Sequence, residues 1–151
     1  KKEDYDVFSF GTGHAKLYVT AADIWNDRIV FGNGIKSFRT KCKEKEYLPN
    51  RTCGNHPHNY HLEILVDNGL LGYFLILSSF LILILKEFNN FKKSSKAKKK
   101  INHFYCFTLV MFIEFFLFKS TGSFFSTFNA TFIFIVFGII GGYFNSIKYE
   151  R

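Results

Sequence analysis

Three long apolar runs constrain the fold of this chain more than any other feature. They are residues 69–85, which carry no charge, residues 104–118, interrupted by Glu114 alone, and residues 124–144, again uncharged. The hydrocarbon core of a bilayer is about 30 Å thick and needs about 20 helical residues to cross it, although about 17 suffice. The third run meets this length alone, and the first two meet it with flanking residues. The sequence therefore predicts an all-α polytopic membrane protein with three transmembrane helices.

Buried helices of a soluble protein are the alternative interpretation of these runs. Helices that lack a polar stripe need cover on every side, and a chain of 151 residues offers little material for that cover,. The mean hydropathy of +0.04 does not favour the soluble alternative, because it averages the apolar runs with a strongly charged part. The membrane interpretation is therefore preferred.

The placement of basic residues predicts the orientation of the helices. Residues 86–103 form a short loop with seven lysines and one glutamate, and short loops of this kind stay in the cytoplasm. Residues 1–68 then form an external segment, and residues 119–123 form an external turn. The basic tail, residues 145–151, returns to the cytoplasm in agreement with the same rule.

The net charge of +8 comes mostly from the cytoplasmic loop. Over residues 1–68, ten basic residues face nine acidic ones, so the external segment is nearly neutral. Basic residues near an anionic membrane surface contribute about 1 kcal/mol each, so lipid headgroups are the expected partner of the loop. Nucleic acid is not an expected partner, because no aromatic or groove-reading pattern accompanies the lysines.

Two helices and a long loop are predicted in the external segment. Leu17, Ala21, Ile24 and Trp25 recur at helical spacing and indicate an amphipathic helix,. Residues 31–57 are rich in Gly, Asn, Lys and Pro and are predicted to form a loop, and loops of this length are often functional,.

The second helix of the external segment is predicted to start at Asn59, which is a favourable N-cap residue. Leu62, Leu65 and Val66 supply its apolar face, and glycines 69 and 72 mark a bend where it meets the first apolar run,. The start of a helix at the membrane surface favours an anion such as phosphate.

Cysteine usage agrees with this sidedness. Cys42 and Cys53 both lie in the external segment, where an oxidising environment permits a disulfide between them,. Such a bond would restrain the loop that precedes the histidines. Cys106 lies within the second apolar run and is interpreted as a small apolar residue.

Three histidines stand close together in the stretch "CGNHPHNYHLE". With Cys53, His56, His58 and His61 are conceivable metal ligands, and His58 and His61 would share a helix face,. No HExxH or paired CxxC motif supports a metal site. A catalytic base and a solvated loop surface are the other interpretations of the same residues.

Other candidate features carry less chemistry. The stretches "GTGHAK" and "GNGIKS" lack the spacing of a phosphate loop, so no nucleotide site is predicted,. Glu114 is costly to bury unpaired within an apolar run. We expect it to pair with Lys119 or with a group on another helix, and Lys119 is alternatively placed to contact a lipid phosphate.

The pattern as a whole resembles the carboxy-terminal part of the O-antigen ligase and O-antigen polymerase family over residues 11–145. The resemblance rests on a "G-H-x-x-L-Y" helix that ends near Trp25, a "G-x-G-x-x-x-F" turn, and "HPHNYHLEILVDNGLLG" before the first apolar run. Its most specific element is His58 and Asn59 followed by Leu62 and Gly69.

The resemblance implies a bacterial inner-membrane glycosyltransferase of the C class that works without a metal or cofactor. Such an enzyme takes a glycan from undecaprenyl diphosphate at the periplasmic face and passes it to lipid A core or to a growing glycan. It also implies that residues 1–68 are periplasmic, that the C-terminus is cytoplasmic, and that His58 is the catalytic histidine. Residues 1–10 contain no secretory signal, so we expect this chain to be the carboxy-terminal part of a longer enzyme.

Displacement of a diphosphate needs a base for the acceptor hydroxyl and cations for the leaving group. A neutral imidazole, with a reference pKa of about 6.5, suits the first task, and arginine's planar fork suits the second. Where many family members have an arginine, this chain has His14, and Tyr18 replaces a tryptophan. The candidates for binding the diphosphate or the acceptor are Arg51, Arg39, His14, Lys16, His56 and Asn59.

Two functions are therefore weighed. The first is a lipid-linked glycan transferase in which His58 activates the acceptor. The alternative is a non-catalytic membrane module whose Cys/His loop binds a metal or a partner protein.

Overall fold

The structure, a computed structural model, describes residues 13–92 and 101–149, and these residues form helices and connecting loops without a strand. The all-α prediction is confirmed for this part of the chain. Expectations for the start of the external segment, the middle of the basic loop and the last two residues lie outside it. The helices are α1 (Gly13–Asp27), α2 (Phe38–Lys41), the 3₁₀ helix η1 (Cys42–Glu44), α3 (Tyr60–Lys92), α4 (Ile101–Glu114) and α5 (Thr127–Tyr149).

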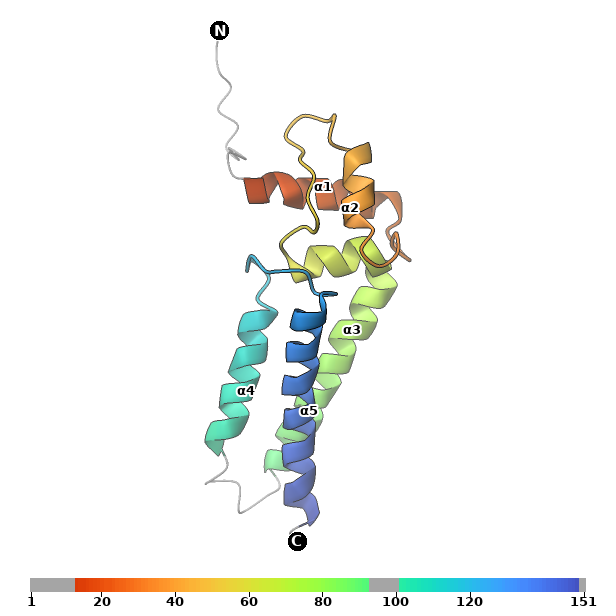
Figure 1. Cartoon of the computed structure of the whole chain (residues 1–151). Coiled ribbons are helices and arrows are strands. Elements are labelled where there is room, and N and C mark those ends of the chain that lie inside the picture. Colours follow the sequence, from red (N-terminus) through yellow and green to blue (C-terminus); the bar gives the residue numbers. More distant parts are fainter. Residues whose placement is uncertain (1–12, 93–100, 150–151) are drawn as a thin grey trace.

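The helices form two parts, which Figure 1 shows one above the other. The part of α3 after Gly69 runs beside α5, and α4 packs on α5, so these three form a bundle. We call the other part the cap. It consists of α1, α2, η1 and residues 60–68 of α3, together with the loops that join them, and it lies across one end of the bundle.

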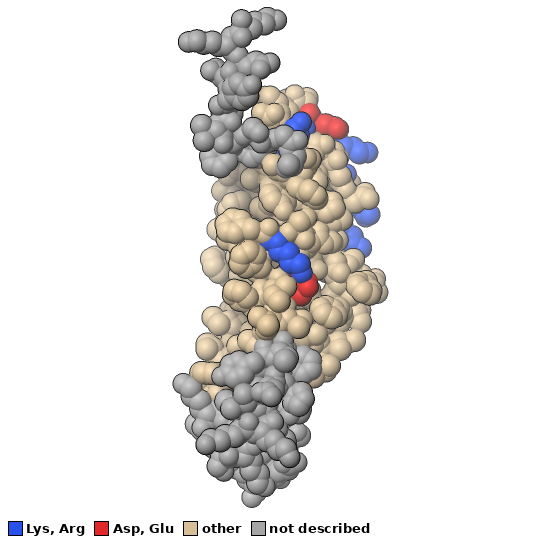
Figure 2. Space-filling view, turned by 90° about the vertical axis from the view of Figure 1, so that its left-hand side faces the viewer, with Lys and Arg blue, Asp and Glu red and all other residues tan. Residues whose placement is uncertain are grey.

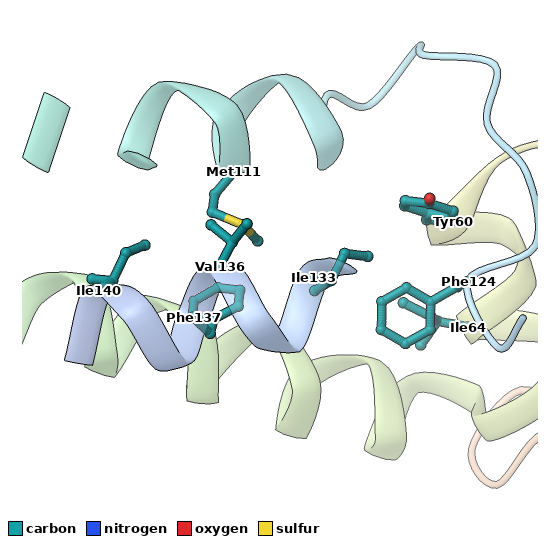
Figure 3. Close-up of a cluster of buried hydrophobic side chains, with 8 residues drawn as sticks. All are labelled: Tyr60, Ile64, Met111, Phe124, Ile133, Val136, Phe137 and Ile140. Atoms are coloured by element: carbon teal, nitrogen blue, oxygen red, sulfur yellow. The ribbon is translucent and has the colours of Figure 1, made fainter. Parts of the chain in front are cut away.

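The bundle is held by a cluster of apolar side chains from all three helices and from the start of α3 (Figure 3). Phe80 of α3 stacks on Phe137 of α5, with ring centroids 4.1 Å apart. Tyr60 lies edge-on to Phe124 at the cap end of the cluster. The buried members are Tyr60, Ile64, Met111, Phe124, Ile133, Val136, Phe137 and Ile140.

The cap has a second, smaller core. Leu17, Ala21 and Ile24 of α1 are buried against Phe38 and Val66, so the predicted amphipathic helix is confirmed with its apolar face inward. Its fourth apolar residue, the tryptophan at position 25, is only partly buried and donates its indole N–H to the Ile29 carbonyl at 3.1 Å.

Part of the predicted loop over residues 31–57 is helical, because it contains α2 and η1. The reason is a carboxylate far away in the sequence. Asp67 accepts hydrogen bonds from the backbone N–H of Lys36 at 2.6 Å and from the N–H and hydroxyl of Ser37 at 3.1 and 2.9 Å. These bonds satisfy donors at the start of α2 that a short helix leaves unpaired, and sequence patterns within the loop do not reveal them.

The predicted bend in α3 is confirmed at Gly69, which has φ 64° and ψ −169°, whereas Gly72 stays helical. The α1–α2 connection supplies the hydrogen bonds that the break removes. The N–H groups of Asn33 and Gly34 donate to the carbonyls of Val66 and Asp67 at 2.8 and 2.9 Å. On the other side of the break, Leu70 and Leu71 donate to the carbonyls of Ile29 and Val30 at 2.8 and 3.1 Å. The bend is thus a hydrogen-bonded junction.

One helix among the described residues, Tyr60–Leu85, is long and apolar enough to cross a membrane by length and composition. Only 11% of its most apolar window is buried, so it is not enclosed by the rest of the chain. The apolar part of α5, Thr127–Gly142, is shorter. The structure therefore has the required helix for one of the three predicted spans.

The helix boundaries also differ from the predicted runs. Helix α3 continues to Lys92, inside the predicted basic loop, and α5 begins at Thr127 rather than at residue 124. Helix α4 ends at Glu114 rather than at Phe118. The carbonyls that follow it accept hydrogen bonds from side chains of α3, which compete with continuation of the helix,.

Glu114 forms one of the predicted pairs. Its carboxylate lies 2.6 Å from the Lys119 ammonium group, and both side chains are less than one-third exposed. The pairing follows from the turn after Glu114, which folds Lys119 back toward the end of α4.

Candidate functional site

Three imidazole rings from two segments, the start of α1 and the loop before α3, meet in the cap, and we call them the histidine cluster. His14 lies in the first turn of α1, His56 in the loop before α3, and His58 next to the start of α3. The ring centroids of His14 and His58 are 5.0 Å apart and edge-on, and those of His56 and His58 are 4.1 Å apart. The structure thus brings together three residues that the sequence offered as candidates.

His58 is held in an uncommon backbone conformation, with φ 57°. Its carbonyl accepts the backbone N–H of Thr121 at 2.8 Å, and the Tyr18 hydroxyl lies 3.5 Å from the same oxygen. The preceding Pro57 is buried. Left-handed φ is rare for residues other than glycine and persists where the surroundings impose it, often at functional sites.

Asn59 is the N-cap of α3, as predicted. Its side-chain oxygen accepts the N–H of Leu62 at 3.1 Å,. Its amide nitrogen donates to the carbonyls of Leu117 and Lys119 at 2.8 and 3.3 Å, which joins the helix start to the turn after α4. The amide oxygen and the amide nitrogen of Asn59 are therefore both hydrogen-bonded within the protein, where they hold the start of α3 against the turn. A direct contact of Asn59 with substrate stays a prediction.

The loop before the histidines is fastened to the cap at two points. Cys42 and Cys53, the pair expected from the sequence, form a disulfide with Cα atoms 5.1 Å apart. The Thr20 hydroxyl of α1 donates to the Thr52 carbonyl at 3.0 Å and lies 3.2 Å from the Thr52 N–H. These bonds fix the chain that delivers His56 to the cluster.

The cluster favours neutral imidazole at one of its members. Burial lowers the pKa of His56, and repulsion from His58 lowers it further. Its Nε2 atom is buried and has no hydrogen-bond partner in the part of the chain that the structure describes. Burial and the neighbouring ring therefore favour an uncharged His56,.

The two predicted arginines have different environments. The Arg51 guanidinium forms a bidentate pair with Asp23 of α1, with Nε 2.6 Å and Nη2 3.2 Å from the carboxylate oxygens, and its Nη1 donates to the Pro49 carbonyl. Arg51 thus fastens the loop along α1, and its donors are used within the protein. This predicted diphosphate ligand is therefore a loop anchor in this structure.

Arg39, by contrast, is exposed, and no ion pair involves it within the described ranges. It lines a depression of about 430 Å³ together with Thr40, Lys43, Cys53, Gly54 and Asn55. Lys43 was missed from the sequence, although its spacing of four from Arg39 was the available signal. Lys16, in the first turn of α1, is half-buried.

The residues named for a metal site do not come together as ligands. Cys53 is in the disulfide, so it offers no thiolate,. His61 lies 2.9 Å from both the Tyr73 hydroxyl and the Phe115 carbonyl through its two ring nitrogens. Within residues 13–92 and 101–149, no group of three His, Cys, Asp or Glu side chains has a geometry for a metal ion.

His61 is therefore a buried structural residue of α3 and not part of a solvated loop. Because the Phe115 carbonyl only accepts, Nε2 carries the proton and Nδ1 accepts from the Tyr73 hydroxyl. The imidazole joins the two halves of α3 to the end of α4. This contact could not be predicted, since Tyr73 and Phe115 reach His61 through the bend and the tertiary fold.

Two buried carboxylates were also missed. Glu63 accepts hydrogen bonds from the Ser123 hydroxyl and the Phe124 N–H in the turn before α5, and Asp67 holds the start of α2. With Asn59 they recur every four residues, which puts all three along one side of the helix. That spacing of polar residues in an otherwise apolar helix was the signal that could have revealed them.

Glu63 precedes the bend and lies in the cap. Burial raises its pKa to about 7, although its hydrogen bonds from Ser123 and Phe124 act in the opposite direction. Because the folded pKa exceeds the ordinary value of 4.5, stability is highest below that value and is lost as the pH rises through about 7,.

Glu63→Gln should remove this pH dependence. We expect the wild-type protein to lose about 3 kcal/mol of unfolding free energy between pH 4.5 and pH 8 through this group, at about 1.4 kcal/mol per pKa unit. The variant should lose less, as measured by thermal unfolding midpoints at both pH values. Asp67 adds to the slope in both proteins, because its pKa is also raised by burial. Equal slopes in wild type and variant would contradict the assignment to Glu63.

Comparisons of the chain with models of protein families, with curated proteins and with solved structures found no match.

Proposed function

We propose that this chain is part of a membrane-embedded transferase that moves a glycan from undecaprenyl diphosphate to an acceptor hydroxyl. The observation that carries the proposal is the histidine cluster. Its three rings lie in the cap, at the start of α3, where the His58 carbonyl accepts the N–H of Thr121 from the turn between α4 and α5. A substrate with a polar head and a long lipid tail requires this combination of a polar site and an adjoining apolar body.

We propose further that the bundle lies in the bilayer, with the part of α3 after Gly69, α4 and α5 as its three crossings. Figure 2 shows most of the charged side chains of one face at the cap end and, apart from one pair, an uncharged surface below them. Soluble proteins rarely expose large apolar areas. The large exposed apolar side chains include Leu71, Phe74, Leu81, Leu109, Phe112, Phe132, Phe134 and Ile135.

In this arrangement the cap faces the periplasm of a bacterial inner membrane, and the C-terminus faces the cytoplasm. Support comes from the lysine-rich connection between α3 and α4, which the rule for basic loops assigns to the cytoplasm,. A disulfide in the cap agrees with an oxidising compartment,.

His58 acts as the base. Its imidazole accepts the proton of the acceptor hydroxyl while that oxygen forms a bond to the anomeric carbon of the glycan. The bond from that carbon to the diphosphate oxygen breaks, and the lipid diphosphate leaves with the electron pair. We assign stabilisation of the negative charge on the leaving group to Arg39 and Lys43, the cations that line a depression with Gly54 and Asn55 of the loop that carries His56,.

The proposal is tested by transfer in proteoliposomes that contain the full-length protein, undecaprenyl-diphosphate-linked glycan and an acceptor such as lipid A core. We expect glycosylated acceptor to form in the presence of a metal chelator, because no step uses a metal. The matched control is the same glycan on undecaprenyl monophosphate, which should be inactive because it is a poorer leaving group. A protein that transfers nothing to any acceptor, from cells whose surface glycans do not change when it is deleted, would instead be a partner-binding module.

A further inference from the structure

We propose that the α1–α2 connection inserts its apolar side chains into the lipid–water interface beside α3 and anchors the cap at a fixed depth on the membrane. This proposal rests on the membrane position of α3 given above, but not on glycan transfer. Its four apolar side chains, Ile29, Val30, Phe31 and Ile35, are all exposed, and Phe31 and Ile35 have exposed fractions of 76% and 66%.

Backbone hydrogen bonds to α3 fix the position of this connection along the axis of α3. The carbonyls of Ile29 and Val30 accept the first N–H groups of the apolar half of α3, those of Leu70 and Leu71. The connection is therefore at the level at which α3 enters its apolar part, and Figure 1 shows it descending from α1 to the bend. If α3 crosses the bilayer, these side chains cannot stand far above the membrane surface.

The exposed side chains also continue an apolar surface. Leu71, whose backbone N–H donates to the Val30 carbonyl, has an exposed side chain, and so do Phe74 and Leu75 in the next turn of α3. Lipid chains that cover this face of α3 would reach the connection without crossing a polar gap. A bilayer is thus the occupant that the surrounding surface favours.

The charges that flank the connection match the headgroup region. Arg28 and Lys36 are exposed on either side of the apolar residues, and both carry charges suited to lipid phosphates. Trp25, at the end of α1, donates its indole N–H to the Ile29 carbonyl. Aromatic residues with a polar group and flanking cations are enriched at membrane–water interfaces.

Tryptophan fluorescence in proteoliposomes tests this placement. The chain has a single tryptophan, so Trp25→Phe gives a dark background into which one reporter is placed. Phe31→Trp is the test variant. Phe74→Trp, on the exposed face of α3, is the lipid control, and Tyr47→Trp, at a side chain that is 80% exposed elsewhere in the cap, is the water control.

We expect the reporter at position 31 to emit at shorter wavelength than the reporter at 47. It should lose about half of its emission to lipids brominated on the upper part of the acyl chain and little to acrylamide, while the reporter at 47 should show the reverse. Behaviour of the reporter at 31 like that at 47 would place the connection in water. Insensitivity to both quenchers would mean that protein covers it, and either result overturns the proposal.

The lipid control separates the possible causes of failure. If brominated lipid does not quench the reporter at 74, α3 does not lie in the bilayer. The interfacial proposal is then wrong as well, because it depends on that position of α3. The fluorescence result does not depend on activity, which the transfer assay above measures separately. A protein that is inactive in that assay but whose reporter at 31 is quenched by lipid would overturn the transferase proposal and leave this one standing.

Discussion

His58→Asn should lower the rate of glycan transfer by about 10²–10⁴-fold, the usual contribution of a general base, and leave the thermal stability of the protein nearly unchanged. Asparagine removes the base but tolerates the left-handed conformation that His58 adopts,. Alanine is a poorer choice because it would add backbone strain at this position. The measurement is the initial rate with undecaprenyl-diphosphate-linked glycan in proteoliposomes, together with the unfolding midpoint.

Two further readouts separate catalysis from structure. His58→Gly also permits the backbone conformation and leaves space beside His56 and His14, so added imidazole should restore part of the rate. Tyr47→Ala, at an exposed position between η1 and the histidines, is the matched control and should retain wild-type activity. His61 is unsuitable as a control, because both of its ring nitrogens are bonded inside the fold. A normal rate in His58→Asn, or a rate that falls only as far as the amount of folded protein, would show that His58 is not the base.

Gly69→Ala should destabilise the protein by about 3 kcal/mol or more, the size of effect that backbone strain and steric overlap produce together. Gly69 has a positive φ, and a Cβ there would overlap the Val30 carbonyl. The same junction constrains Gly32, whose φ is 72° and whose Cβ would overlap the backbone of Asp67. Because neither backbone can move without breaking the hydrogen bonds between them, relaxation is limited.

Unfolding of the purified protein in detergent, followed by circular dichroism, measures the loss. Gly138→Ala is the matched control, since a Cβ there meets open space within a regular helix, and we expect it to be neutral or stabilising by up to about 1 kcal/mol. The variant with both Gly32→Ala and Gly69→Ala should be less destabilised than the sum of the single changes, because both break one junction. A Gly69→Ala protein as stable as Gly138→Ala would contradict the junction.

Local features of the site were predictable. The inward face of α1 follows from residues spaced by one helical turn, the cap of α3 from Asn59, and the bend from a glycine at position 69. Each depends on interactions between residues close in the chain, such as steric limits on φ or the first hydrogen bonds of a helix. The disulfide pair was also predictable, because two cysteines only eleven positions apart in one polar segment leave few alternatives.

The partners of polar side chains were not predictable in the same way. Arg51 was a candidate phosphate ligand because arginine's planar fork suits a phosphate, yet the fold places Asp23 beside it,. Arg39, predicted on the same grounds, remains exposed at the depression. Nothing in the local sequence pattern distinguishes the two arginines, since the difference depends on Asp23 of α1, which precedes Arg51 by 28 positions.

By itself, the sequence determined the helical class of the described residues, the inward face of α1, the start and bend of α3, and His58 as the leading candidate base. Only the tertiary structure decided that His14 and His56 join His58, that His61 is buried, and that α4 ends at Glu114. The physical reason is range. Helical periodicity, capping and backbone sterics act within a few residues, whereas a buried polar group takes whichever partner the packed helices bring to it, and that partner is often more than 50 residues away.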